Sequence, residues 1–215
     1  MLITSLLQSG GFIYLLYFII ALLIAFTFHE FAHAWVSKRL GDPTPEMLGR
    51  VTLNPIAHLD LMGTIFLLFV GFGWGKPVPF NPRYFKNPRR DIFLTALAGP
   101  ATNFILALIF ALPFRIGEIT GISFFSTSLA PLFLIIIDIN IILGVFNLLP
   151  IPPLDGSKIL YLFLSAKRIS EIEQFGPYLL FGLIFLALLG GTDILGQIIF
   201  GVTETIKYLF VIWPG

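Results

Sequence analysis

The 215-residue sequence contains no cysteine and few charged residues, with Asp, Glu, Lys and Arg making up only 12% of it. The absence of cysteine excludes disulfides, thiolate metal ligands and a cysteine nucleophile. Soluble domains carry about 25% charged residues, so the low charge content argues against a soluble protein. The net charge of +1 gives no indication of binding to nucleic acid or to an acidic substrate.

Apolar residues are in excess, at 57% of the sequence, and they occur in long blocks. About 20 apolar residues are needed for a helix to cross the hydrocarbon core of a membrane. The first block lacks a basic segment before it, so we interpret it as a retained helix and not as a cleaved signal. The sequence predicts an all-α polytopic membrane protein with about five transmembrane helices, at 11–37, 92–113, 129–149, 177–190 extending to about 196, and 197–213, the last either a tilted span or an interfacial helix.

A shorter apolar segment, 61–75, ends in the glycine-rich sequence "GFGWG". It is too short for a full crossing, and this favours a re-entrant loop or hairpin near residues 59–91. The loops 38–58, 76–91 and 149–176 hold 11 of the 13 Lys and Arg residues. The positive-inside rule places these loops in the cytoplasm. We therefore expect a multi-pass protein of the cell membrane whose N-terminus is extracytoplasmic.

The first predicted helix contains the sequence "HEFAH", with His29 and His33 four residues apart and Glu30 between them. This spacing places both imidazoles on one helix face, where they can bind one zinc ion. Glu30 lies about 100° around the helix and can act as the general base of a metallopeptidase. The alternative is that both histidines are packed and neutral. A charged group at mid-membrane costs about 2.5–3.5 kcal/mol, so a shared metal ion explains this group of polar residues better. Lys38 and Arg39 follow the motif closely, which places the site near the cytoplasmic side.

Catalytic zinc needs a third protein ligand, and Asp155 in "NLLPIPPLDG" is the candidate. The prolines before it interrupt the helix, and broken backbone in a membrane is tolerated where it lines a wet cavity or is buried. An ordinary Asp-Gly turn at the interface is the alternative. For Asp138 we expect a structural hydrogen bond to a neighbouring helix.

Other polar residues have simpler interpretations. Gly99 and Asn103 share a helix face, which is typical of close helix packing with one interhelical hydrogen bond. His58 lies in a turn that Asn54 and Pro55 favour, with contact to a metal ligand as the alternative. Arg89 and Arg90 are interpreted as topology anchors.

Taken together, "HEFAH" and "NLLPIPPLDG" resemble the HExxH and NxxPxPxLDG signatures of the site-2 proteases, which are zinc intramembrane peptidases. Three further blocks, among them "ALAGPATNF", are similar to the compact prokaryotic branch, and the resemblance covers about residues 25–165. It implies that His29, His33 and Asp155 bind one zinc ion per chain and that Glu30 is the general base. It also implies that Asn147 binds the substrate or the oxyanion.

The resemblance further implies three core helices, at 11–37, 92–113 and 129–165, the last interrupted at the prolines. We expect one integral-membrane peptidase domain over 1–215, with a catalytic core at about 11–165 and C-terminal helices at about 175–213. We expect the chain to differ from many relatives in having no PDZ domain and no CBS domain.

The predicted function is cleavage of a transmembrane protein substrate near the cytoplasmic side of the bilayer. A substrate helix must unwind before its carbonyls can be attacked, and the opened backbone or the 61–80 segment could pair with it as an added strand. The alternatives are a metal transporter that uses the same three residues and a catalytically inactive scaffold. A transporter often contains internal repeats, and the sequence has none. Substrate identity and oligomeric state are left open.

Overall fold

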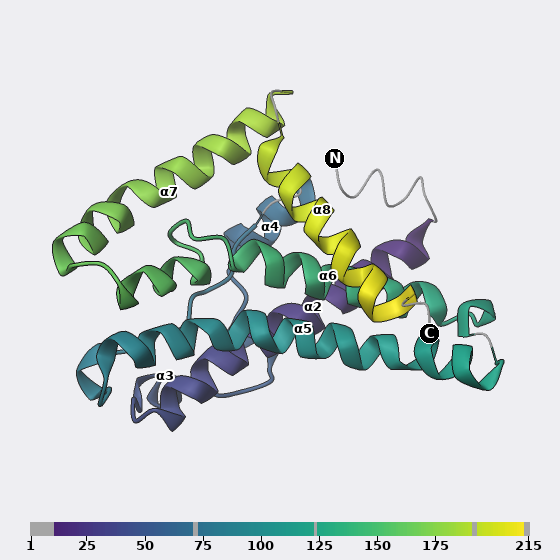
Figure 1. Cartoon of the computed structure of the whole chain (residues 1–215), viewed down its shortest axis with the longest axis horizontal. Helices are drawn as coiled ribbons and strands as arrows, with labels where there is room; N and C mark the ends of the chain where they lie inside the picture. Colours follow the sequence, from purple (N-terminus) through teal and green to yellow (C-terminus); the bar gives the residue numbers. More distant parts are fainter. Residues whose placement is uncertain (1–10, 71–72, 123, 191–192, 213–215) are drawn as a thin grey trace.

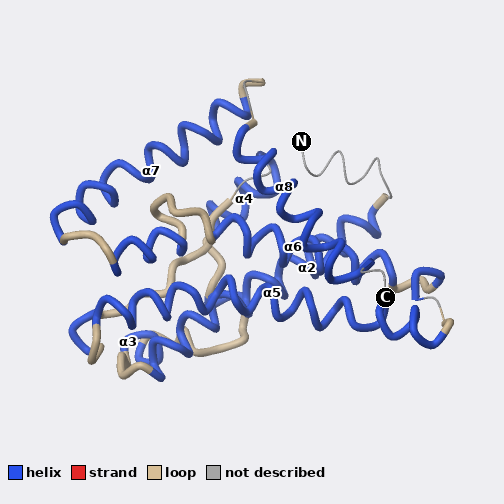
Figure 2. The backbone as a smooth tube through the Cα atoms, viewed as in Figure 1, coloured by secondary structure: helices blue, strands red, loops and turns tan. Residues whose placement is uncertain are grey.

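The computed structural model describes residues 11–70, 73–122, 124–190 and 193–212, which are mostly helical. Within these ranges the chain forms no β-strand, only an isolated antiparallel bridge (Figure 2). The α-helices are α2 (Phe12–Arg39), α3 (Thr44–Met47), α4 (Leu61–Val70), α5 (Pro88–Thr120), α6 (Ala130–Asn147), α7 (Ala166–Leu188) and α8 (Ile194–Lys207). Four short 3-10 helices, η1 (Pro55–Ala57), η2 (Pro82–Tyr84), η3 (Phe124–Ser126) and η4 (Asp155–Leu162), and a terminal π-helix, η5 (Tyr208–Ile212), complete the described elements.

Five of these helices have the length and the apolar composition of a membrane crossing: α2, α5, α6, α7, and α8 continued into η5. The predicted all-α polytopic architecture with about five spans is therefore confirmed. The segment expected at 197–213 belongs to the fifth of these helices, which runs over Ile194–Val211.

The centre of the fold is a three-helix core in which α2, α5 and α6 pack pairwise against one another (Figure 1). Buried alanines and isoleucines fill it, including Ala107, Ala111, Ile137 and Ile141. Small side chains let membrane helices approach closely, which van der Waals contact then stabilises. This core positions the polar residues of α2 against the middle of α5.

Helix α5 is longer than the expected span of 92–113. It begins at Pro88, whose missing N–H costs nothing at the first helical position, and it continues through Pro100 and Pro113 to Thr120. Prolines inside transmembrane helices are tolerated because their surroundings satisfy the freed backbone groups. The predicted span of 92–113 therefore lies within this longer helix.

The hairpin expected near residues 59–91 is present. Helix α4 has only ten residues, and the chain then returns so that Leu59 and Gly75 form the antiparallel bridge. The N–H of Lys76 donates to the carbonyl of His58 at 2.8 Å. Gly63 faces the Trp74 backbone so closely that any Cβ would overlap it. The two ends of this segment consequently lie side by side.

Helix α6 ends at Asn147, and the prolines that follow form a turn, as predicted from the sequence. The chain then continues as the 3-10 helix η4 and not as a second α-helical half. Backbone groups within the turn are partly satisfied locally, since Leu154 N donates to Ile151 O at 2.9 Å and Ser157 N donates to Leu154 O at 3.1 Å. Asp155 is the first residue of η4, immediately beyond this turn.

Helix α7 begins at Ala166, about nine residues earlier than the expected start near 175. It lies apart from the three-helix core and packs on η4 and α8 (Figure 1). Helix α8 then returns against α6. Lys207 Nζ lies 2.7 Å from Asp138 Oδ1, so Asp138 makes the contact with a neighbouring helix that we expected.

Candidate metal centre

Two histidines of α2 and one aspartate of η4 meet at the centre of the molecule. The Nε2 atoms of His29 and His33 are 3.0 Å apart, and the two rings are nearly perpendicular. Asp155 Oδ2 lies 3.1 Å from His29 Nε2 and 3.2 Å from His33 Nε2. Both histidines are buried. Three possible metal-binding atoms from distant parts of the sequence therefore face one point.

The hydrogen bond of His29 fixes which of its nitrogens carries hydrogen. His29 Nδ1 lies 2.6 Å from Asn103 Oδ1. The amide nitrogen of Asn103 donates to Ala25 O at 3.0 Å and to Asn140 Oδ1 at 2.9 Å, so Oδ1 is the accepting side of that amide. His29 must then donate through Nδ1, which leaves a lone pair on Nε2 of the neutral ring.

His33 is fixed in the same way by a backbone carbonyl. Its Nδ1 lies 2.7 Å from Thr95 O, which can only accept. Nε2 of neutral His33 therefore also carries a lone pair. Oδ2 of Asp155 is buried with no hydrogen-bond donor of its own. Three lone pairs at these separations repel one another unless a cation lies among them, either a proton on one imidazole or a metal ion.

The donor set fits zinc. Two imidazoles and one carboxylate, with a fourth position open, are a ligand combination of catalytic zinc sites. A tetrahedral zinc with ligands at about 2.0–2.1 Å separates those ligand atoms by about 3.3 Å, and the three separations here are 3.0, 3.1 and 3.2 Å. Bonds from Nδ1 to an amide or a carbonyl are also the usual way in which metal-binding histidines are oriented.

Gly99 gives the two imidazoles their space. A Cβ built on Gly99 would overlap His33 Nε2 and His29 Cε1. Gly99 lies one turn from both Thr95 and Asn103 on α5, so one face of this helix supplies the space for the rings and both of their hydrogen-bond acceptors. The small-residue packing expected for Gly99 is present, and it is directed at the candidate metal centre.

Glu30 is buried beside a buried arginine. Arg50 Nη2 lies 3.8 Å from Glu30 Oε2, and Arg50 also donates to Lys76 O at 2.5 Å and to Pro77 O at 2.8 Å. Burial lowers the pKa of Arg50, while the Glu30 carboxylate opposes that shift. Arg50 thus connects the carboxylate on α2 to the segment that follows the α4 hairpin.

His58 supports Arg50 and does not contact the three candidate ligands. It is fully buried, its Nε2 lies 2.9 Å from Thr52 O, and its Nδ1 lies 3.3 Å from Arg50 Nη2. With Nε2 donating to the carbonyl, Nδ1 is free to accept from the guanidinium. The turn expected here is also present, because Asn54 Oδ1 accepts from Ile56 N at 3.1 Å.

The chain is similar to known metallopeptidases. The sequence profile of peptidase family M50 matches residues 17–119 and 111–190. The protein "Putative zinc metalloprotease YwhC" of Bacillus subtilis is 42% identical over 180 residues, which cover 81% of this chain and 82% of that protein. The chain belongs to peptidase family M50.

More distant relatives carry similar names. "Putative zinc metalloprotease Rip2" of Mycobacterium tuberculosis is 30% identical over 189 residues, covering 84% of this chain and 68% of that protein. "Zinc metalloprotease MJ0392" of Methanocaldococcus jannaschii is 26% identical over 69% of this chain, which is only 34% of that protein. No solved structure matches the chain at a significant level. The recognition of the site-2 protease family from the two sequence motifs is confirmed.

The fifth candidate site residue of this M50 peptidase, Asn147, lies at the end of α6. Its Nδ2 donates to Leu143 O of the same helix at 2.9 Å, and one amide hydrogen is left for another acceptor. A role in binding the oxyanion remains a prediction, and it requires the amide to use that second hydrogen or to turn.

The sequence did not predict the roles of two residues of this centre, and it predicted only part of the role of a third. Arg50 was counted only as a topological charge, and Asn140 was not singled out. Asn103 was expected to make one interhelical hydrogen bond, whereas it orients His29 and joins α2, α5 and α6. Both asparagines are fully buried in predicted membrane helices, and an uncharged amide in such a helix is the signal that was available.

Residues of η4 and α7 form a hydrogen-bonded cluster that holds the segment carrying Asp155 against α7. Lys158 Nζ lies 2.9 Å from Tyr161 Oη and 2.9 Å from Glu173 Oε1, and Tyr161 also contacts Glu173. Burial lowers the pKa of Lys158, but the bonds to Tyr161 and Glu173 outweigh it and the pKa is raised. The charged ammonium therefore ties η4 to the first turns of α7.

Proposed function

We propose that His29, His33 and Asp155 hold the zinc ion of this peptidase and that Glu30 is its general base. Membership of family M50 and the names of the relatives support a zinc-dependent intramembrane protease. The observation that carries the assignment of residues is the convergence of three lone pairs within 3.2 Å. The 1–215 chain would then act as one peptidase domain.

Zinc bound there would supply Lewis acidity, which activates water and polarises a peptide carbonyl. The Glu30 carboxylate accepts the proton of the attacking water and later passes it to the leaving nitrogen. Arg50 keeps that carboxylate in place beside the centre. The free amide hydrogen of Asn147 donates to the oxygen on which negative charge develops. Asp155 contributes a negative charge that offsets part of the charge of the cation.

The substrates are membrane proteins, because the centre is built from helices that have the length and composition of membrane spans. A substrate helix hides its carbonyls in its own hydrogen bonds, so it must unwind before attack. Helix-weakening residues near the cleaved bond should therefore favour cleavage. Substrates whose cleavage does not respond to such residues would contradict this step.

We further propose that the centre lies near the cytoplasmic face and that the N-terminus is extracytoplasmic. Figure 1 supports this orientation, because the end of α2, the start of α5 and the start of α7 point to the same side of the molecule. Basic residues gather at these ends, among them Lys38, Arg39, Arg89, Arg90 and Lys167. The positive-inside rule places such an end in the cytoplasm.

The decisive experiment is cleavage by the purified protein in liposomes. Single-span substrates with and without a central Gly or Pro are incubated with wild type, with Glu30→Gln and with wild type after zinc chelation, and zinc content is measured for each. We expect cleavage by wild type alone, with zinc retained in Glu30→Gln. His58→Gln serves as a control histidine variant, because His58 is not a proposed ligand and the variant should retain zinc.

Two results would contradict the proposal. Wild type that contains zinc but cleaves no substrate, and that instead moves zinc across the liposome membrane, would favour a transporter. Wild type that contains no zinc and cleaves nothing would favour a scaffold.

A further inference from the structure

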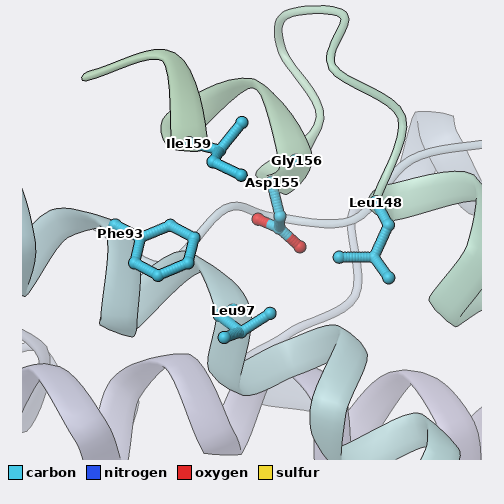
Figure 3. Close-up of a pocket in the computed structure, with 6 residues that line it drawn as sticks. All are labelled: Phe93, Leu97, Leu148, Asp155, Gly156 and Ile159. Carbon is cyan, nitrogen blue, oxygen red and sulfur yellow. The ribbon is translucent and has the colours of Figure 1, made fainter. Parts of the chain in front are cut away.

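An apolar cleft opens directly beside the candidate metal centre. Its volume is about 130 Å³, and it lies between α5, the end of α6 and η4, lined by Phe93, Leu97, Leu148, Asp155, Gly156 and Ile159. Figure 3 shows the Asp155 side chain pointing from η4 towards α5, with Leu97 below it and Phe93 and Leu148 on either side. Apart from Asp155, every side chain in this lining is apolar.

The cleft is therefore lined by apolar residues except for the carboxylate of Asp155. Asp155 keeps 22% of its side chain exposed, although its Oδ2 faces the two buried histidines. A lipid acyl chain in this cleft would surround the Asp155 carboxylate with hydrocarbon, and a charge without polar partners costs free energy. A peptide matches both surfaces, because its backbone is polar and its side chain can be apolar.

We propose that this cleft is a subsite that binds one apolar side chain of the substrate, from a residue that flanks the cleaved bond. The inference rests on the proposed function, since it requires the substrate backbone to reach the centre formed by His29, His33 and Asp155. The occupant is a medium-sized aliphatic side chain, such as that of Leu, Ile or Val, from the unwound segment of the substrate.

The size of the cleft sets this preference. A cavity of about 150 Å³ in another protein holds one benzene molecule, so about 130 Å³ accommodates a branched aliphatic group and not an indole ring. Leu97, 36% exposed, borders the opening from α5. Leu108 lies three turns further along the same face of α5, is 48% exposed and does not line the cleft.

The first arm of the test varies one substrate position at a time. A single-span substrate with a mapped cleavage site carries Ala, Val, Leu, Phe or Trp at each residue around the cleaved bond. For wild type we expect one flanking position at which Leu is preferred over Ala by on the order of 10-fold or more in kcat/KM, and Trp is rejected. Leu97→Trp fills the cleft, so Ala should become preferred over Leu at that position.

Leu108→Trp is the matched control, and it should keep the wild-type order of preference. Phe93→Ala, which enlarges the cleft, should admit Phe or Trp at the same position and leave the preferences at other positions unchanged. The proposal is overturned if Leu97→Trp and Leu108→Trp give the same preferences as wild type, or if all positions shift together.

The second arm does not depend on turnover. A photoreactive phenylalanine analogue replaces Leu97 or Leu108 in the Glu30→Gln background, and the substrate is irradiated with each variant in liposomes. We expect crosslinks from position 97 to the residues around the mapped cleavage site and none there from position 108. Crosslinks from position 97 only to lipid would overturn the subsite even when wild type cleaves the substrate, whereas absence of zinc and of any cleavage would overturn the proposed function itself.

Discussion

Arg50 Nη2 lies 3.8 Å from Glu30 Oε2, and both residues are buried. This distance is too long for a hydrogen bond, so the guanidinium attracts the carboxylate without taking up its lone pairs. Its stronger bonds go to the carbonyls of Lys76 and Pro77. Arg50 therefore stabilises the position of Glu30 and leaves the carboxylate free to accept a proton.

Replacing Arg50 with Gln should impair turnover more than binding. Glu30 would lose its nearby positive charge, and removing one member of a buried charge pair costs about 3–5 kcal/mol. We expect kcat to fall at least 10-fold, with KM changed by less than about 3-fold, because a 1 Å displacement of a catalytic group can cost about 100-fold in rate. Kinetics on one reconstituted substrate measure both constants.

Two further arginine variants distinguish positioning from a general loss of fold. Arg83→Gln changes an exposed arginine and should leave kcat as in wild type. Arg50→Lys keeps the charge without the planar fork, so its kcat should lie between those of wild type and Arg50→Gln. If Arg50→Gln and Arg50→Lys lose zinc and thermal stability to the same extent, the loss comes from the fold, and a role of Arg50 in positioning Glu30 is contradicted.

Gly99→Ala should disturb the metal centre. The added methyl group would overlap the His33 and His29 rings, so one of the imidazoles must move and the convergence of the three ligand atoms is lost. We expect zinc content after dialysis to fall well below one per chain, as measured by elemental analysis. Gly182→Ala is the matched control, since a Cβ there meets nothing within 4 Å, and this variant should keep its zinc.

Asn103→Leu should weaken zinc binding without removing a ligand. It leaves His29 Nδ1 without its acceptor, and loss of such a supporting bond typically costs 10–100-fold in metal affinity. Asn103→Asp keeps an oxygen that can accept from His29 and should retain more affinity than Asn103→Leu. Competition with a zinc-binding dye gives the two affinities, and equal values for both variants would rule out orientation of His29 as the cause.

The ion pair between Asp138 and Lys207 should matter for stability and not for catalysis. It joins α6 to α8 with both side chains only partly exposed, so Asp138→Asn should lower the free energy of unfolding by roughly 1–3 kcal/mol, less than a fully buried pair would lose. The double variant Asp138→Asn with Lys207→Met should recover part of that loss. Thermal unfolding in detergent measures the effect, and losses in Asp138→Asn and Lys207→Met that simply add up in the double variant would show that the pair itself contributes nothing.

Local spacing made the larger part of the centre predictable. The four-residue separation of His29 and His33 fixes their shared helix face, and the prolines before Asp155 force a break in the helix. Neither feature depends on how distant helices meet. That Asp155 lies within 3.2 Å of both imidazoles needed the structure, because only the packing of η4 on α5 brings it there.

The partners of the supporting residues could not be predicted, because they depend on the register between helices. Asn103 faces His29 only because α5 packs on α2 at one particular height, and a shift of one turn would place another residue there. The same holds for Arg50, because its partners Lys76 and Pro77 reach it only through the return of the chain that pairs Leu59 with Gly75. Helix ends were also imprecise: apolar content predicted a span of 92–113, whereas α5 begins at Pro88 and ends at Thr120, because a helix can continue beyond the hydrocarbon core of the membrane.

The ten-residue length of α4 affects the surrounding lipid. Ten helical residues extend about 15 Å, which is half of a hydrocarbon layer about 30 Å thick. The outward apolar side chains of α4, among them Met62, Ile65, Phe66 and Phe69, can therefore meet only part of the acyl chains, and local thinning of the bilayer is one way in which so short an apolar segment is accommodated. Acyl-chain length should thus alter the rate of this peptidase even when every protein contact is unchanged.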